Sequence, residues 1–420
     1  MILWARERPR RSQSLFRCPT VLCAVAIACT LATRALHAQT PVSRANAISA
    51  AISHGPRNAV ARADSAAAGA ALAFAEQFEN PGLGASYTKS TPTQHYALDI
   101  PIDAPWMRRP RIGSALASLD AATNRFAFTT ASLSYETDTM YTRALAVARR
   151  AELSQRNARD ADSLLILASL RRDAGDASEL DVQLAGVFAG QLANTASADS
   201  LDAVGALLLV QIAMGLSGAT ASIVLSDSLA LDALDGTRTG INPTQTLLVN
   251  AAEQELRAAD LAVQFERRRL LAAPTLSLGF ESQNPGGPSG ALPTIGLAFP
   301  IPIFNRNSAS ILAAQAARSR SAASLAAIRL EVDAATEQAR RTLVVARARA
   351  ERSARLVTGA DNIAALSLLA YREGASSLLN VLEAQRTSRA ALAQYIDDLA
   401  AARNAAGLVR LLSQVVATKP

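Results

Sequence analysis

Few residues in this chain are of types and spacings that could do chemistry. The 420-residue sequence has three cysteines, Cys18, Cys23 and Cys29, and its only histidines after residue 38 are His54 and His95. No two histidines lie four residues apart, and no glycine-rich phosphate loop occurs. The residue types therefore predict no catalytic site, no metal site and no cofactor, and we expect a protein that is not an enzyme.

Residues 1–38 resemble a secretory signal peptide, with five arginines before an apolar stretch, 21–32, that is too short to cross a bilayer. We expect cleavage after Ala38, which would remove all three cysteines; the alternative is a lipoprotein signal that uses Cys29. This segment carries six arginines and one glutamate, so its loss would lower the net charge from +7 to +2. The basic composition is therefore poor support for nucleic-acid binding.

The prolines divide the rest of the chain. One group lies between residues 81 and 110 and another between 274 and 302, whereas 111–242 and 303–419 contain none. Because proline breaks the interior of a helix, this pattern predicts two short non-helical segments, each followed by very long helices. Half of the residues are hydrophobic but only 4% are aromatic, so small side chains suited to close helix packing dominate.

The second half of the chain repeats the first. "RRDAGDASELDV" from Arg171 resembles "AYREGASSLLNV" from Ala370, and the step from Pro101 to Gly175 equals that from Pro300 to Gly374, 74 residues. We therefore expect a tandem duplication, with a first structural repeat at 39–240, a second at 241–415 and a C-terminal tail at 416–420.

Each repeat is expected to hold one β-hairpin and two long helices. Alternating apolar residues predict the hairpins at about 82–103 and 275–302. The long helices are expected at about 111–173 and 177–215, and at 306–372 and 376–413, with a further helix at 243–272.

Pro101 and Pro105, and likewise Pro300 and Pro302, are expected to mark the junctions between strand and helix. Strands of about 8 to 10 residues match the length that a tilted strand needs to cross a bilayer. Four strands cannot close a barrel, so a protein that spans a membrane with them would have to oligomerise.

Two stretches carry a resemblance to a known family. "LAFPIPIFNRN" at 297–307, leading into a long helix, and "AYREGASSLLNVLEAQR" at 370–386 resemble the outer-membrane efflux protein family, of which TolC is the type member. The resemblance implies an α+β membrane protein that forms a homotrimer. Four strands per protomer would build a 12-stranded outer-membrane β-barrel, continuous with a long periplasmic α-helical barrel and belted by residues 216–242 and the C-terminus.

The resemblance implies that the protein is the outer-membrane exit duct of a tripartite efflux system and conducts substrates passively. Its partners would be a periplasmic adaptor (membrane fusion) protein, an inner-membrane pump of RND or ABC type, and outer-membrane lipid, with no nucleic acid. Two alternatives stay open: the outer-membrane component of type I protein secretion, and a soluble periplasmic coiled-coil protein. The second would leave the duplicated hairpins without a purpose.

The resemblance also implies a gate at the periplasmic helix tips. Tyr371 and Asp181 occupy the family's positions for a closing contact. Asn380 and Glu383 occupy two positions that are acidic in the type member and line the constriction, so the acidic ring would be reduced to Glu383. Such a ring would still favour cations.

Two further positions bear on this gate. Ser376 stands where the type member has an arginine, so one closing link is expected to be missing. Gly175 and Gly374 mark the two helical turns. A glycine there suits a left-handed helix end, and in this family the same turns are where the adaptor docks.

Overall fold

The computed structural model describes residues 40–414 except 90–91, 217, 219, 231–245, 271–272 and 283–290. The expected signal peptide at 1–38, the alternative lipidation site Cys29 and the expected tail at 416–420 lie outside the described residues.

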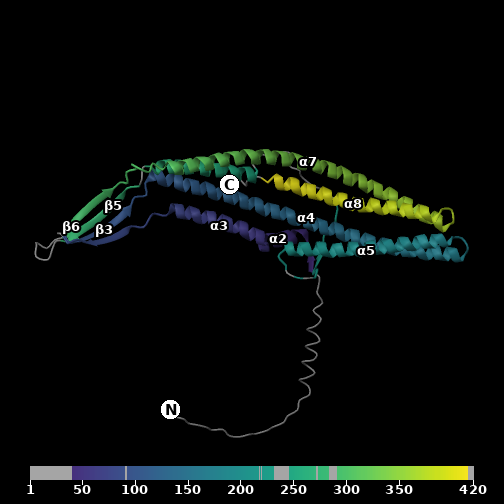
Figure 1. The fold of residues 1–420 in the computed structure, drawn as a ribbon. Coiled ribbons are helices and arrows are strands. Elements are labelled where there is room, and N and C mark those ends of the chain that lie inside the picture. The colour runs from purple at the N-terminus through teal and green to yellow at the C-terminus, as the bar shows by residue number, and fades with distance from the viewer. Residues whose placement is uncertain are drawn as a thin grey trace, which may run out of the picture.

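The chain forms a long curved rod with a small sheet at one end and two helical turns at the other (Figure 1). Two helices run along most of the rod, α4 (Pro105–Asp173) and α7 (Ser308–Arg372). At about 1.5 Å per residue, each is roughly 100 Å long. α5 (Glu179–Ala213) and α8 (Leu378–Leu412) return from the turns and cover the half of the rod nearest to them.

Shorter helices cover the half of the rod nearest the sheet. They are α2 (Arg44–His54), α3 (Pro56–Glu76) and α6 (Leu247–Arg268). The same order of elements therefore occurs twice: a shorter helical segment, a hairpin, a long helix and a returning helix. The sequence patterns predicted no helix at residues 44–76, where Gly55 and Pro56 separate α2 from α3.

Small side chains hold the long helices together. The buried residues of α4 and α7 are mostly alanine, serine and threonine, and most of the larger ones are isolated along the helices. Small residues let helix axes approach closely, so the rod is built without a bulky core. This agrees with the low aromatic content of the sequence.

α4 begins earlier than the proline pattern predicts. Its start was expected near residue 111, but the helix begins at Pro105 and carries Pro110 in its interior. Pro105 is tolerated because the first N–H groups of a helix have no intrahelical acceptor. Pro110 lacks the N–H that would reach the Trp106 carbonyl, and Arg268 of α6 donates to that carbonyl instead, at 3.1 Å. The arginine thus accounts for a proline inside the helix.

The sheet at the end of the rod has four antiparallel strands in the order β2-β3-β5-β6. They are β2 (Gly82–Tyr87), β3 (Gln94–Pro101), β5 (Thr275–Ser282) and β6 (Ala291–Ala298). The central pair, β3 and β5, joins the two hairpins. Within the described residues, β2 and β6 each have one unpaired edge.

The two faces of this sheet differ in polarity. Directly paired residues share a face, and one face carries the rows Leu83–Leu98–Leu278–Ile295 and Ala85–Tyr96–Phe280–Pro293. The opposite face carries the rows Gly82–Asp99–Ser277–Gly296 and Ser86–His95–Glu281–Leu292. The apolar face is open to the surroundings, since Leu83 is 82% and Ile295 80% exposed.

A second, small sheet lies near the middle of the rod, where β1 (Thr40–Val42) pairs in parallel with β4 (Ile223–Leu225). The fully buried Tyr141 of α4 holds this sheet in place, since its hydroxyl lies 2.8 Å from two acceptors that share its single proton, the Val42 carbonyl and Oδ2 of Asp227. Burial raises the pKa of Tyr141, and so does its hydrogen bond to Asp227. Of the belt segment expected at 216–242, residues 217, 219 and 231–242 lie outside the described part.

Candidate functional site

The two helical turns at the end of the rod share one backbone geometry. Gly175 follows α4 with φ +85° and Gly374 follows α7 with φ +77°, both in the left-handed region that favours glycine. The next N–H bonds back five residues in each turn, from Asp176 to Arg171 and from Ala375 to Ala370, at 2.8 Å in both cases. These are Schellman motifs, in which N–H groups beyond the helix donate hydrogen bonds to carbonyls of its last turn.

Tyr371 lies one turn before Gly374, at the point where the two helical hairpins meet. Its side chain is only 3% exposed and packs in a cluster with Leu164 and Ala168 of α4, Ala185 of α5, and Leu378 and Val381 of α8. The hydroxyl is buried and has no hydrogen-bond partner among the described residues.

Arg171, at the end of α4, is the group that contacts Tyr371 most directly. Its guanidinium stacks over the Tyr371 ring at 4.6 Å from the centroid, and Nη1 donates to the Tyr371 carbonyl at 2.5 Å. A Cβ atom at Gly374 would lie 3.6 Å from Nη2, so the arginine rests against the turn itself. Burial raises the pKa of Tyr371; Arg171 opposes that rise and Asp181 adds to it.

Asp181 is near this cluster but is engaged elsewhere. Its carboxylate accepts hydrogen bonds from the backbone N–H and the hydroxyl of Ser178, at 3.0 and 2.9 Å, and Ser178 in turn accepts from the Asp181 N–H. This is a capping box at the start of α5. The structure joins the Tyr371 hydroxyl and the Asp181 carboxylate by no hydrogen bond.

Asn380 and Glu383 lie on an exposed face of α8, away from the Tyr371 cluster. Asn380 donates to Ser376 Oγ at 3.3 Å, and Glu383 lies 3.9 Å from Arg386 with both side chains largely exposed. An exposed ion pair at this distance contributes little to stability. Neither residue lines the cavity that lies between the two hairpins.

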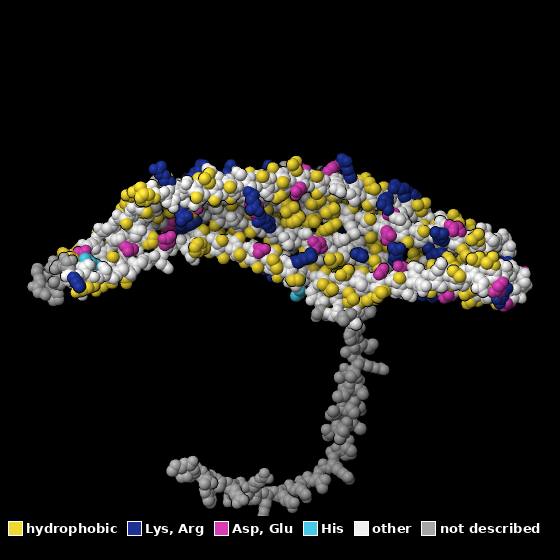
Figure 2. All heavy atoms as spheres, viewed as in Figure 1, with side chains coloured by type: hydrophobic (Ala, Val, Ile, Leu, Met, Phe, Trp, Pro, Cys, Tyr) yellow, Lys and Arg dark blue, Asp and Glu magenta, His cyan; other side chains and the backbone are white. Residues whose placement is uncertain are grey.

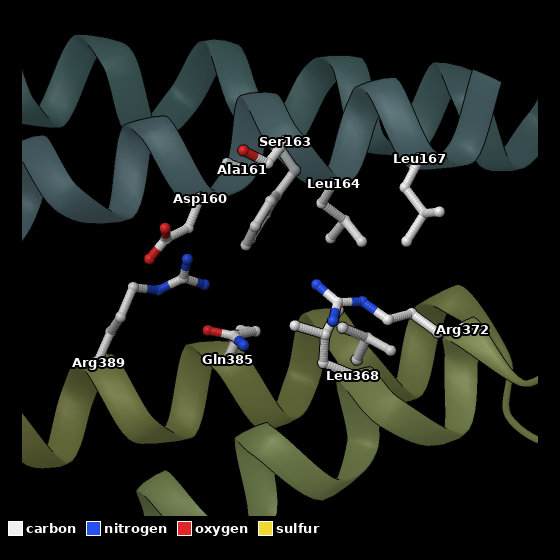
Figure 3. A pocket seen from close by; sticks show the side chains of 11 residues that line it. Asp160, Ala161, Ser163, Leu164, Leu167, Leu368, Arg372, Gln385 and Arg389 are labelled. Carbon is white, nitrogen blue, oxygen red and sulfur yellow. The ribbon is translucent and has the colours of Figure 1, made fainter. Parts of the chain in front are cut away.

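A cavity of about 430 Å³ separates the two hairpins behind the Tyr371 cluster. Figure 3 shows side chains of α4 on one side of it, and of α7 and α8 on the other, with the guanidinium groups of Arg372 and Arg389 in the space between. Its walls include Asp160, Leu164, Leu167, Phe188, Leu368 and Gln385.

Arg389 of α8 crosses this space to the other hairpin. Its guanidinium lies over the ring of Phe188, on α5, at 4.6 Å from the centroid. Burial lowers the pKa of Arg389, and the charge of Asp160 offsets part of that effect. The sequence patterns did not point to Arg171, Phe188 or Arg389; their only signal was that each lies within 15 residues of a turn glycine, which too many other residues share.

The four junction prolines lie at the opposite end of the rod. Pro101 is the last residue of β3 and Pro105 the first of α4. Pro300 and Pro302 stand between the end of β6 and the start of α7. Asn307, just before α7, has a left-handed φ of 54° and donates from Nδ2 to the backbone and side chain of Glu266, each at 2.8 Å.

The described part of the chain holds no group of three or more His, Cys, Asp or Glu side chains placed to bind a metal ion. His95 instead contacts Glu281 at 3.2 Å across β3 and β5, on the polar face of the sheet.

The fold matches solved membrane-protein structures over most of its length. A membrane protein from Pseudomonas aeruginosa has a TM-score of 0.75 at 20% identity, covering 88% of this chain and 92% of that chain. The outer membrane protein VceC from Vibrio cholerae has a TM-score of 0.71 at 16% identity, covering 88% and 96%. The MtrE outer membrane channel of Neisseria gonorrhoeae, in its open state, has a TM-score of 0.69 at 16% identity, covering 87% and 88%.

At these identities the likeness shows the fold. No protein-family model matches the sequence, and no curated protein sequence matches it at a significant level.

Proposed function

We propose that this chain, whose fold is that of the outer-membrane efflux channels, is the outer-membrane exit duct of a tripartite efflux system. The observation that carries the proposal is the four-stranded sheet. One of its faces is apolar and exposed, the other is polar, and the strands continue through the proline junctions into helices of roughly 100 Å. Such a sheet suits lipid on one side and a water-filled lumen on the other.

The protein acts as a homotrimer. A lone four-stranded sheet in lipid would leave backbone groups unsatisfied at β2 and β6, and pairing β6 of one protomer with β2 of the next removes both edges. Three protomers give a 12-stranded barrel above a tube of long helices, and the matching halves of each protomer derive from a tandem duplication.

Exposed apolar residues support this assembly. Hydrophobic side chains lie at the surface along the rod (Figure 2). In the tip half, α5 and α7 are the outer helices of the row α7-α8-α4-α5 in Figure 1 and expose Val187, Leu201, Val344 and Leu366. α5 is also long and apolar enough to cross a membrane, but it pairs with α4 along the hairpin. These faces would pack against neighbouring protomers in the tube.

The duct has its gate at the helix tips. Tyr371 and Asp181 belong to the closing region, and Asn380 and Glu383 line the constriction, where the three Glu383 carboxylates favour cations. The turns at Gly175 and Gly374 receive the tip of a periplasmic adaptor, which connects the duct to an inner-membrane pump of RND or ABC type. The protein performs no chemistry.

Fractionation of cells that produce the protein tests this function. The proposal expects a trimer in outer-membrane detergent extracts that dissociates to monomers only on heating. Release of the protein by osmotic shock would contradict the proposal and favour a soluble periplasmic coiled-coil protein. Pull-down of the adaptor then distinguishes tripartite efflux from type I protein secretion by the pump that accompanies it.

A further inference from the structure

The helix tips hold two arginine–aromatic contacts that run in opposite directions between the hairpins. Arg171 belongs to the first hairpin, α4–α5, and stacks on Tyr371 of the second, α7–α8. Arg389 belongs to the second hairpin and stacks on Phe188 of the first. Each hairpin therefore supplies one cation and one ring to the other.

From this arrangement we infer that the two contacts form a latch, which holds the hairpins of each protomer together at their tips and keeps the gate closed. The latch is defined by Arg171, Tyr371, Phe188 and Arg389. The inference rests on the proposed function, and it names gating residues that the expected Tyr371–Asp181 contact does not include.

The cavity explains why so few contacts hold the two hairpins together at their tips. A cavity of about 430 Å³ lies between the hairpins there, so close packing of small side chains does not join them at this level. Long arginine side chains cross the gap where shorter residues do not reach. The Tyr371 cluster closes the gap on the side of the turns.

The environment favours cation–π attraction at both contacts. This attraction grows when the partners are shielded from water. The Tyr371 ring is almost fully buried, and Arg389 is buried enough that the pKa of its guanidinium falls. Arg171 adds a hydrogen bond to the Tyr371 carbonyl, which lies at the end of α7, where a cation is also favoured by the helix dipole.

The positions expected from the resemblance are less suited to this task here. The Asp181 carboxylate is engaged in capping α5, and Ser376 replaces the arginine of the type member. The latch therefore depends on the ring of Tyr371 rather than on its hydroxyl, and this difference can be measured.

The test is single-channel conductance of the full-length trimer in planar bilayers. We expect Arg171→Ala with Arg389→Ala to raise the mean conductance several-fold. Tyr371→Leu with Phe188→Leu removes the same two contacts from the other side and should raise it similarly. Tyr371→Phe keeps the ring and should leave the mean conductance unchanged. Arg156→Ala with Arg352→Ala removes two exposed arginines from α4 and α7 and is the matched control.

Each outcome decides one question. Channels whose conductance is the same in the wild type and in both double variants would overturn the latch, and so would a several-fold rise in Tyr371→Phe alone. A wild-type trimer that forms no channels would instead contradict the proposed function. Heat-modifiable trimers from each variant show that it has folded, and the two double variants reach the same contacts through different substitutions, so that one substitution failing to fold does not remove the test.

Discussion

Ser353 donates a hydrogen bond to Asp398 across the α7–α8 hairpin, 45 residues further along the chain. Ser154 makes the same bond to Asp199 across α4–α5, also 45 residues apart. Arg349 lies 2.8 Å from Asp398, and Arg150 lies 3.9 Å from Asp199. Each hairpin thus holds a trio of one serine, one aspartate and one arginine. The residues of the α7–α8 trio stand 199 positions after their counterparts in the α4–α5 trio, the same step that relates Gly374 to Gly175. The two trios fix the register of returning helix against long helix.

The two trios differ in burial, which gives a prediction on stability. The Asp398 side chain is 4% exposed and also accepts from Gln394, whereas that of Asp199 is 16% exposed with a more distant arginine. Asp398→Ala should lower the free energy of unfolding by about 1–3 kcal/mol, since it leaves the buried Ser353 hydroxyl without its acceptor. Asp199→Ala is the matched control and should cost less. Guanidinium denaturation followed by circular dichroism measures both, and equal losses would contradict this reading.

The sheet predicts opposite responses to arginine at neighbouring positions of β6. Ile295 lies on the apolar face and Thr294 on the polar face. An arginine on the lipid side of a barrel costs about 2–4 kcal/mol near the bilayer midplane, whereas the lumen tolerates it. Ile295→Arg should therefore reduce the yield of heat-modifiable trimer in the outer membrane, and Thr294→Arg should not. Equal yields would mean that the apolar face does not meet lipid.

Glu383 gives a prediction on ion selectivity. In the proposed trimer the three Glu383 carboxylates would form the acidic ring, so Glu383→Gln should lower the permeability of cations relative to anions and move the reversal potential in a salt gradient towards that of anions. Asn380→Asp restores the second acidic position and should shift the reversal potential towards that of cations. If neither variant changes the reversal potential, Glu383 is an ordinary surface charge.

The effects of substituting Arg268 and Pro110 on the free energy of unfolding should be coupled. The guanidinium of Arg268 donates to the Trp106 carbonyl, which is the intrahelical acceptor for a backbone N–H at position 110. Arg268→Ala should cost about 0.5–1.5 kcal/mol in the wild-type background. It should cost less in a Pro110→Ala background, because the substitution restores a backbone N–H that can donate to this carbonyl within the helix. A double-mutant cycle measures the coupling energy, and additive effects would show that the two residues do not interact.

Alkaline pH should lower the stability of the helix tips, where Tyr371 is buried. Burial raises the pKa of Tyr371 above the ordinary value of 10.0. The stability linked to the neutral hydroxyl is therefore fully present below about pH 10 and is lost as the pH rises through the folded-state pKa. Absorbance titration of tyrosinate in the wild type and in Tyr371→Phe should show one late-titrating group fewer in the variant. A variant that instead loses one tyrosine titrating at the ordinary pKa of about 10 would place the Tyr371 hydroxyl in water.

Much of this fold could be predicted from the spacing of prolines and glycines, because each acts on the local backbone. Gly175 and Gly374 end the two long helices, and the strands of the four-stranded sheet lie within the two proline groups. The start of α4 could not be predicted, because a side chain from another helix, Arg268, compensates for Pro110. The partner of Tyr371 was hidden for the same reason: Arg171 is 200 residues away, and only the packing of the two hairpins brings them together.

The central claim is that the protein is a duct, and the current through the purified wild-type trimer in a planar bilayer tests it most directly. We expect stepwise increases in current as single trimers insert, with a low conductance that reflects the closed tips. A trimer that is intact by gel mobility and gives no conductance, in bilayers where a porin prepared in the same way does, would contradict this claim.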